Sequence, residues 1–278
     1  MTNNPFTTGH MTLIADSGST KTNWRLNGQP IETIGLNPVR DNREHIDRVL
    51  YSLPDAPVKR IFFYGAGCIS PFKQTIVQAL AQKFPEAGTI EVESDMLGAA
   101  RALCRHSEGL VGILGTGSNT CHYDGTTITR NVSPLGYILG DEGSGAVLGR
   151  RLVGDLLKEQ MPEELKRSFL EYFQLTPTQI IENVYRRPLP NQFLASLVPF
   201  LRLHRREDSV HDLLIDEFGR FFRRNVALYH RPELPLHLAG GVAATFQPEI
   251  QEAAAALHYH LGRILQAPIE DLVKFHQE

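Results

Sequence analysis

A carboxylate, a tight polar turn and a lysine follow one another near the start of the chain. Asp16 ends a short apolar run, a glycine-bearing turn comes next, and Lys21 begins the stretch that returns. The turn consists of Ser17, Gly18, Ser19 and Thr20. Such turns let backbone N–H groups converge on an anion, and a neighbouring carboxylate can hold Mg²⁺ through water. The stretch indicates a nucleotide phosphate with its metal ion, and an ordinary β-hairpin turn is the alternative.

A second glycine-bearing turn, which contains Thr116 and Gly117, joins the apolar run 111–114 to a returning run over 120–123. The same kind of hairpin therefore occurs once early and once in the middle of the chain. Such a duplication indicates two related halves that face one ligand.

A third glycine site comes late. Gly240 and Gly241 directly follow the strand predicted over residues 234–239. Two adjacent glycines allow the backbone to approach a flat or charged ligand closely.

Apolar periodicity places further candidates at strand ends. Up to Arg105 the pattern predicts three strands, a helix, a strand, a helix, a strand and a helix. Gly67 and Cys68 follow the strand predicted over 60–64, and Asp95 follows the strand predicted over 89–93. Open α/β sheets bind ligands at the carboxyl ends of their strands, so these residues are candidates for a site.

From Leu110 the order of strands begins again. The remaining predicted elements are three strands within 111–131, a long helix from Asp141 to about residue 160, further helices up to residue 229, a strand over 234–239, and helices over 248–265 and 268–275. We expect one domain of residues 1–107 with 262–278, and a second of residues 108–261 with a helical insertion.

Four segments together resemble a known family. The segments DSGSTKT, GTGSN and LAGGVA, in this order, resemble the two phosphate motifs and the adenosine motif of the actin/heat-shock-ATPase/sugar-kinase superfamily. Within it, LGYILGDEGSG is similar to the signature of N-acetylglucosamine kinases and of the BadF/BadG/BcrA/BcrD-type ATPases. The resemblance implies an α/β fold of two ribonuclease-H-like domains that form an ATP-binding clamshell. It also implies ATP-dependent phosphorylation of an amino sugar, with N-acetylglucosamine at its primary hydroxyl as the first candidate.

The resemblance also implies roles for individual residues. The residues implied for ATP are Ser17, Gly18, Ser19, Thr20, Lys21, Thr116, Gly117, Gly240 and Gly241. Those implied for the sugar are Asn37, Gly67, Cys68, Gly140 and Asp141. Asp16 is implied as the ligand of Mg²⁺, and Asp95 as the general base.

Several of these residues also fit a plainer interpretation. Asn37 precedes a proline and is a common turn former, and Asp95 would suit the N-cap of a helix. Lys21 would suit a solvated strand position, and Cys68 a small wall of a pocket. Leu135 stands where animal relatives carry a tryptophan, which leaves open the surface on which the sugar stacks and the identity of the sugar.

Composition narrows the class of protein. The 278 residues are 42% hydrophobic and carry a formal net charge of −3, which permits a buried core and argues against a nucleic-acid binder. The three cysteines lack CxxC spacing, which indicates a reducing compartment and no zinc site. No apolar run reaches membrane-spanning length, and residues 1–10 resemble a loose leader rather than a signal peptide. We expect a cytoplasmic protein with no membrane partner, and a homodimer is left open.

Two other functions remain as alternatives. One is a BadF-type ATPase that activates a partner enzyme. Relatives of that type hold an iron–sulfur cluster with cysteines near a KCAAGTG-like segment, which this chain lacks. The other is a sugar or nucleotide sensor without turnover. Such a regulator would need a DNA-binding module, and few residues precede Leu13.

Overall fold

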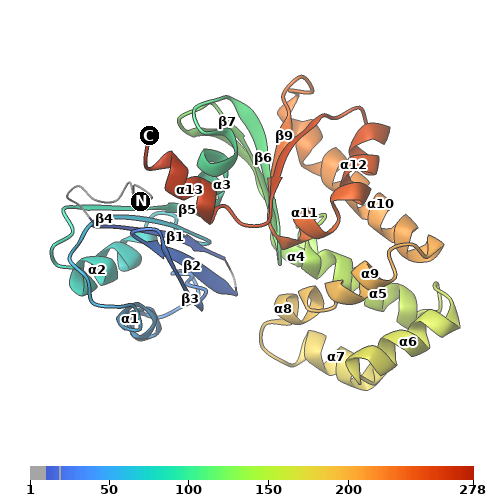
Figure 1. The fold of residues 1–278 in the computed structure, drawn as a ribbon. Helices are drawn as coiled ribbons and strands as arrows, with labels where there is room; N and C mark the ends of the chain where they lie inside the picture. Colours follow the sequence, from blue (N-terminus) through green and yellow to red (C-terminus); the bar gives the residue numbers. More distant parts are fainter. Residues whose placement is uncertain (1–10, 19) are drawn as a thin grey trace, which may run out of the picture. The chain divides into compact units, whose positions relative to one another are not determined.

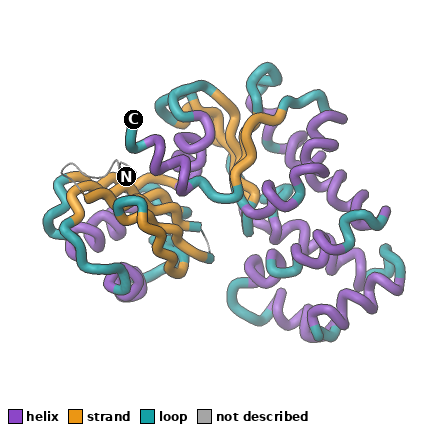
Figure 2. Tube along the Cα trace, in the orientation of Figure 1, coloured by secondary structure: helices purple, strands orange, loops and turns teal. Residues whose placement is uncertain are grey.

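The computed structural model describes residues 11–18 and 20–278. They form two compact units (Figure 1). Unit 1 contains the described residues up to His106 together with Ala267–Glu278, and unit 2 contains Ser107–Gln266. Each unit is built on one five-stranded mixed sheet with helices packed against it (Figure 2).

The sheet of unit 1 has the strand order β3-β2-β1-β4-β5. Its strands are β1 (Met11–Ser17), β2 (Lys21–Leu26), β3 (Gln29–Ile34), β4 (Val58–Gly65) and β5 (Thr89–Ser94). Strand β1 pairs antiparallel with β2 and parallel with β4. Its helices are α1 (Arg43–Tyr51), α2 (Lys73–Lys83), α3 (Asp95–Cys104) and α13 (Ile269–Phe275). The order of elements predicted for this region is confirmed.

Strand β4 is apolar along most of its length because helices cover both of its faces. Phe63 packs into the core that α1 and α2 complete. Phe62 stacks on His276, directly after α13, with ring centroids 3.7 Å apart. Helix α13, from the end of the chain, packs on α3 and β1.

The sheet of unit 2 has the strand order β10-β9-β6-β7-β8. Its strands are β6 (Gly109–Leu114), β7 (Ser118–Tyr123), β8 (Ile128–Val132), β9 (Leu236–Ala239) and β10 (Leu261–Leu265). Between β8 and β9 come α4 (Gly136–Leu139), α5 (Gly145–Leu157), α6 (Glu163–Phe173), α7 (Pro177–Tyr185), α8 (Pro190–Ala195), α9 (Val198–Leu203), α10 (Asp208–Arg224) and the 3₁₀ helix η1 (Val226–Tyr229). Helices α11 (Gly241–Thr245) and α12 (Gln247–Ala256) precede β10.

The two sheets repeat one topology. In both, a central strand (β1 or β6) pairs antiparallel with the next strand in the chain and parallel with a later one. The third strand, β3 or β8, pairs antiparallel with the second. The last strand, β5 or β10, pairs parallel with the fourth. The early and middle hairpins found in the sequence are thus the same element of each sheet.

Three local predictions were wrong. The long helix begins at Gly145 and not at Asp141, because Asp141 adopts a left-handed φ of 54° and Ser144 caps the helix. The helix predicted over 248–265 ends at Ala256, and the chain returns as β10, which pairs with β9. The pair Ser70-Pro71 predicts a helix with serine at its cap and proline in its first turn, but α2 begins at Lys73 without a side-chain cap.

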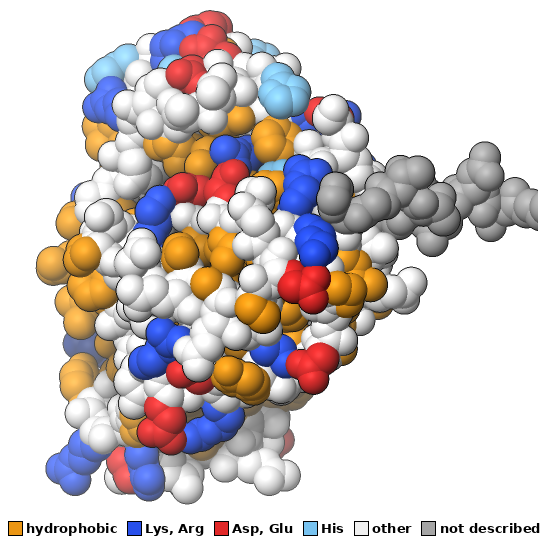
Figure 3. Space-filling model, turned by 90° about the vertical axis from the view of Figure 1, so that its left-hand side faces the viewer, with side chains coloured by type: hydrophobic (Ala, Val, Ile, Leu, Met, Phe, Trp, Pro, Cys, Tyr) orange, Lys and Arg blue, Asp and Glu red, His pale blue; other side chains and the backbone are white. Residues whose placement is uncertain are grey.

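No helix among the described residues is long and apolar enough to cross a membrane. On the face drawn in Figure 3, basic and acidic side chains are interspersed over the described residues. This pattern differs from the single-sign patch typical of a nucleic-acid-binding face.

Candidate active site

In unit 1 the register of the strands brings two carboxylates to one edge of the sheet. Asp16 in β1 lies beside Tyr64 in β4, and Tyr64 lies beside Glu93 in β5. Asp95 follows the end of β5 and is the first residue of α3. Asp16 and Asp95 therefore share the carboxyl edge of a parallel β1-β4-β5 set, where α/β sheets bind ligands.

Asp95 is not the cap of its helix. Ser94 is the N-cap, and its hydroxyl accepts a hydrogen bond from the N–H of Leu97 at 3.2 Å. The Asp95 carboxylate accepts one from the N–H of Met96 at 2.9 Å. The capping alternative for Asp95 is therefore wrong, and its carboxylate has capacity for a further partner.

Burial dominates the electrostatics of this edge. It raises the pKa of Asp95. Burial and, second, repulsion from Asp95 raise the pKa of Asp16 to about 7, against the opposing effects of an Asn23 hydrogen bond and Lys21. Two crowded carboxylates are stabilised by a cation. A Mg²⁺ ion, which keeps several waters and binds through one or two carboxylates plus phosphates, fits this donor set. Among the described residues no group of three His, Cys, Asp or Glu could hold a metal alone.

The structure brings the predicted sugar residues of unit 1 together. Gly67 has a φ of +76°, and a Cβ there would lie 2.2 Å from Oδ1 of Asn37. The same oxygen accepts a hydrogen bond from the N–H of Val39 at 3.0 Å. Cys68 is only 2% exposed, and burial, with Asp95 as the next cause, raises its pKa to about 12. The thiol of Cys68 is thus buried and neutral, with Asp95 near enough to affect its pKa.

The side chains of Ser17 and Lys21, at the two ends of the first turn, have partners within unit 1. The hydroxyl of Ser17 is fully buried and accepts the N–H of Leu36 at 2.9 Å, which ties the Asn37 loop to β1. The N–H of Gly18 closes the turn on the carbonyl of Lys21 at 3.0 Å. The ammonium of Lys21 pairs with Glu32 at 2.8 Å. Thr20 is exposed, and Ser19 lies outside the described residues.

In unit 2 a carboxylate lies beside the second turn. A Cβ on Gly117 would lie 3.0 Å from Oδ2 of Asp141, and the carboxylate also accepts the N–H of Ser118. Burial, and second the charge of Glu142, raise the pKa of Asp141 to about 6. A Cβ on Gly140 would lie 2.0 Å from the carbonyl oxygen of Pro134, so only glycine fits there. Thr116 is half-buried in the turn, and its carbonyl accepts the N–H of Ala146 at 3.0 Å.

The two glycines of the third site have different surroundings. Gly240 has a φ of +118°, and a Cβ there would lie 2.3 Å from the carbonyl oxygen of Leu114, so β9 and β6 require a glycine. Gly241 is exposed, and a Cβ there would meet no atom within 4 Å. Packing thus requires a glycine at position 240, and Gly241 leaves an open surface at the start of α11.

Sequence reasoning missed two residues that contact the site. Asn23 hydrogen-bonds Asp16 and is its partner in the β1–β2 register, so counting back from the hairpin turn would have found it. Glu217 accepts the N–H of Gly143 from a buried position in α10. The sequence feature that could have identified Glu217 is a charged residue on the apolar face of a helix. Leu135 is 59% exposed at the start of α4.

The comparisons with known proteins concern the fold and the family of the chain. No protein-family model and no curated protein matches the chain. Among solved structures, a "putative N-acetylglucosamine kinase" from Porphyromonas gingivalis is 46% identical, covers 96% of this chain and 98% of its own, and has a TM-score of 0.93. A protein of the same description from Chromobacterium violaceum is 21% identical over 96% and 98%, with a TM-score of 0.72. A ROK family glucokinase from Streptomyces griseus, in complex with glucose and AMPPNP, is 14% identical over 96% and 98%, with a TM-score of 0.58.

The fold of this chain is that of the actin-like ATPase sugar kinases, with two α/β units. The two more distant similarities show the fold alone. The 46% identity over nearly the whole of both chains shows the family as well as the fold. The chain belongs to the N-acetylglucosamine kinase family and is an ATP-dependent sugar kinase, which confirms the family predicted from the motifs.

Proposed function

We propose that the chain transfers the γ-phosphoryl group of ATP to the primary hydroxyl of N-acetylglucosamine. The observation that carries the proposal is the Asp95 carboxylate at the edge of the unit 1 sheet. Its charge acts on Cys68, the residue directly after Gly67, whose backbone packs on Asn37. A base next to groups that can hold a hydroxylated ring is the minimum that phosphorylation of a sugar requires.

Asp95 acts as the general base in this proposal. As the hydroxyl oxygen forms its bond to phosphorus and the bond to ADP breaks, the hydroxyl proton passes to the Asp95 carboxylate. Burial raises the pKa of Asp95 and so strengthens it as a base. The thiol of Cys68 stays neutral beside it and does not compete for the phosphoryl group.

The other roles follow the chemistry of each group. Asn37 donates and accepts hydrogen bonds to sugar hydroxyls, Gly67 keeps that amide in place, and Asp141 accepts from a sugar hydroxyl. Asp16 holds Mg²⁺, which neutralises phosphate charge when bound. The remaining proposed residues, for the sugar and then for ATP, are Cys68, Gly140, Ser17, Gly18, Ser19, Thr20, Lys21, Thr116, Gly117, Gly240 and Gly241.

ADP release measured against a panel of sugars tests the proposal. The panel contains N-acetylglucosamine, N-acetylmannosamine, glucosamine and glucose, and phosphorus NMR of the product identifies the phosphorylated oxygen. We expect the highest kcat/KM with N-acetylglucosamine and a 6-phosphate product. Equal ADP release with and without sugar would contradict the proposal and favour an ATPase that serves a partner enzyme.

The breadth of substrate depends on Leu135. A leucine in place of a tryptophan offers a smaller wall, so N-acetylmuramic acid, with its additional lactyl group, should be accepted in part. A preference for N-acetylglucosamine of about a hundredfold or more would rule out this wider pocket.

A further inference from the structure

One face of α10 carries a buried charge that the reaction as described does not use. Glu217 is fully buried, among the apolar residues of the same helix. Its buried neighbours in α10 are Val210, Leu213, Leu214, Phe218 and Phe221. An ionised carboxylate in such a place is unfavourable unless each of its oxygens is paired.

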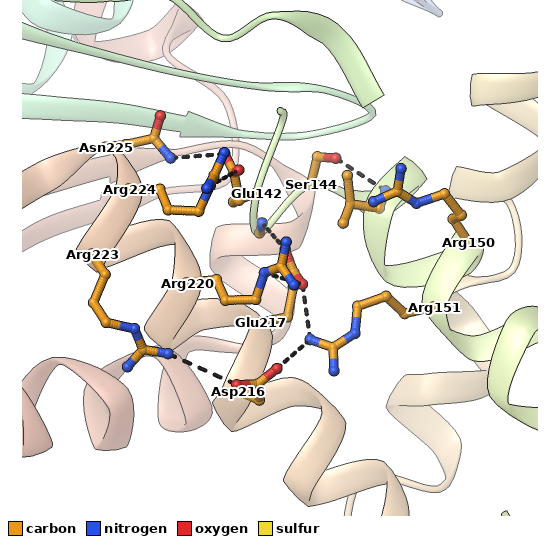
Figure 4. A network of polar contacts seen from close by, with 12 residues as sticks. Glu142, Ser144, Arg150, Arg151, Asp216, Glu217, Arg220, Arg223, Arg224 and Asn225 are labelled. Atoms are coloured by element: carbon orange, nitrogen blue, oxygen red, sulfur yellow. Dashed lines mark hydrogen bonds and ion pairs between the residues drawn. The ribbon is translucent and has the colours of Figure 1, made fainter. Parts of the chain in front are cut away.

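Both oxygens of Glu217 are paired. Oε1 accepts the backbone N–H of Gly143 at 3.0 Å. Oε2 accepts from Nη1 of Arg151, in α5, at 2.9 Å and lies 3.6 Å from Nε of Arg220. Arg151 also bonds the exposed Asp216 at 2.7 Å. Figure 4 shows Arg151 reaching both acids, so the guanidinium links α5 to α10 at this point.

Helix α10 holds the residue before Gly143 as well. The carboxylate of Glu142, which is 5% exposed, accepts hydrogen bonds from Nε of Arg224 and, at 3.1 Å, from Nδ2 of Asn225 (Figure 4). Arg224 comes two helical turns after Glu217, so one helix contacts two consecutive residues of the same turn.

These two residues directly follow Asp141. Asp141 has a left-handed φ of 54°, unusual for a residue with a side chain, and Gly143 has a φ of 76°. A segment of such backbone persists only where its surroundings hold it. The contacts of α10 with Glu142 and Gly143 supply that support on one side. On the other side the N–H of Asp141 donates to the carbonyl of Pro134 at 2.8 Å.

We propose that Glu217 is a positioning residue, which acts through the Gly143 N–H to keep the Asp141 carboxylate against Gly117. The proposal rests on the proposed function, in which Asp141 binds a sugar hydroxyl. Loss of the bond from Gly143 to Glu217 leaves the 141–143 turn free to change its backbone angles. Asp141 then spends less time against Gly117, and the affinity for the sugar falls while the site of proton transfer, in unit 1, is untouched.

Three variants test this. Glu217→Ala removes the acceptor of the Gly143 N–H, and Glu217→Gln keeps an oxygen acceptor but removes the charge. Glu249→Ala is the matched control. Glu249 is another buried glutamate of unit 2, 5% exposed, and it is paired with Arg205 through both oxygens. Its partners include no residue of the 140–146 segment.

We expect Glu217→Ala to raise the KM for the sugar by about 10- to 100-fold, with the KM for ATP and kcat changed less than about threefold. Glu217→Gln should restore the sugar KM to within about threefold of the wild type. Glu249→Ala should lower the thermal midpoint and leave both KM values unchanged. A sugar KM in Glu217→Ala equal to that of Glu249→Ala would overturn the proposal, because Glu217 would then serve stability alone.

Hydrogen exchange of the ligand-free proteins gives a readout that needs no substrate. The amide of Gly143 should exchange faster in Glu217→Ala only, and unchanged exchange would overturn the proposal. If Glu217→Ala does not fold, Glu217→Asp, which withdraws the carboxylate by one methylene, takes its place with the same expectations. A wild type that phosphorylates no sugar would contradict the proposed function, and the exchange measurement would still decide whether Glu217 holds the turn.

Discussion

The two units use one sheet topology and supply their carboxylates differently. In unit 1, Asp16 belongs to β1 itself and its position is set by strand register. In unit 2, the corresponding strand, β6, ends without an acid, and Asp141 comes to the turn from the segment after α4. A group fixed by a sheet needs little further support, whereas one carried by an irregular segment needs side chains that hold it.

The segments that follow the third strand of each sheet can be compared in the same way. After β3, Asn37 places its Oδ1 against Gly67, and after β8, Asp141 places its Oδ2 against Gly117. Both segments are held by an acid that accepts a backbone N–H. Asp41 accepts from Asn37 at 2.8 Å, four residues away, and Glu217 accepts from Gly143, 74 residues away. Both segments thus place a side-chain oxygen beside a glycine, but Gly67 follows β4 whereas Gly117 lies in the β6–β7 turn. The two units therefore differ in the element that this oxygen meets, in its charge and in its means of support.

The largest effect is expected from Asp95, the acid of unit 1 proposed as the base. Asp95→Asn keeps the size of the side chain and removes its basicity, so kcat should fall by about 10²–10⁴-fold. ATP binding should hardly change, and no helix cap is lost, since Ser94 and not Asp95 caps α3. Steady-state kinetics and calorimetric titration with ATP measure both. If Asp95→Asn keeps its turnover and Asp141→Asn loses it, the base is Asp141 of unit 2 and not Asp95 of unit 1.

Asp16 should show the next largest effect. Asp16→Asn weakens the hold on Mg²⁺, and the Mg²⁺ concentration for half-maximal rate should rise about 10- to 100-fold, as is typical when an outer-sphere partner is lost. Sugar binding, measured by titration without nucleotide, should persist. A parallel loss of sugar and nucleotide binding would instead make Asp16 a structural residue of β1.

Smaller effects are expected at the two glycines. Gly67→Ala forces a Cβ into the 2.2 Å approach to Asn37 at a φ of +76°, so the sugar KM should rise about tenfold, the equivalent of one hydrogen bond. Gly117→Ala meets Asp141 at 3.0 Å without a positive φ and should have a weaker effect. Gly88→Ala, where no atom lies within 4 Å of the added Cβ, is the control. A greater effect at Gly117 than at Gly67 would contradict this order.

The sequence was informative where local pattern determines structure. Strand ends, hairpin turns and glycines are local, so Asp16, Gly67, Asp95 and Gly117 could be located from it. The pairings that complete the site are not local. Glu217 meets Gly143 only because α10 packs on α5, and no periodicity reveals that contact. The strand β10 was hidden for a similar reason, because an alanine-rich helix runs into a segment whose strand identity depends on pairing with β9.

The smallest expected effect is on stability, and it distinguishes the two oxygens that lie beside glycines. Burial raises the pKa of Asp141 to about 6, against about 3.9 for an aspartate in an unfolded chain. The folded protein therefore binds the proton more tightly than the unfolded chain. The stabilising contribution of this proton is complete below about pH 4 and is lost as the pH rises through about 6.

Asp141→Asn removes this titration, and Asn37→Ser, its counterpart in unit 1, removes none. The thermal midpoint of Asp141→Asn relative to the wild type should therefore rise between pH 4.5 and pH 7.5. The expected gain is about 3 °C, after allowance for the partial exposure of Asp141. The corresponding difference for Asn37→Ser should not depend on pH. The titrations of Asp16 and Asp95 also affect the midpoint, but they occur in all three proteins and so cancel in both differences. Scanning calorimetry at several pH values measures both differences. If the Asp141→Asn difference is flat, the carboxylate beside Gly117 titrates as it would in water, and its burial does not raise its pKa.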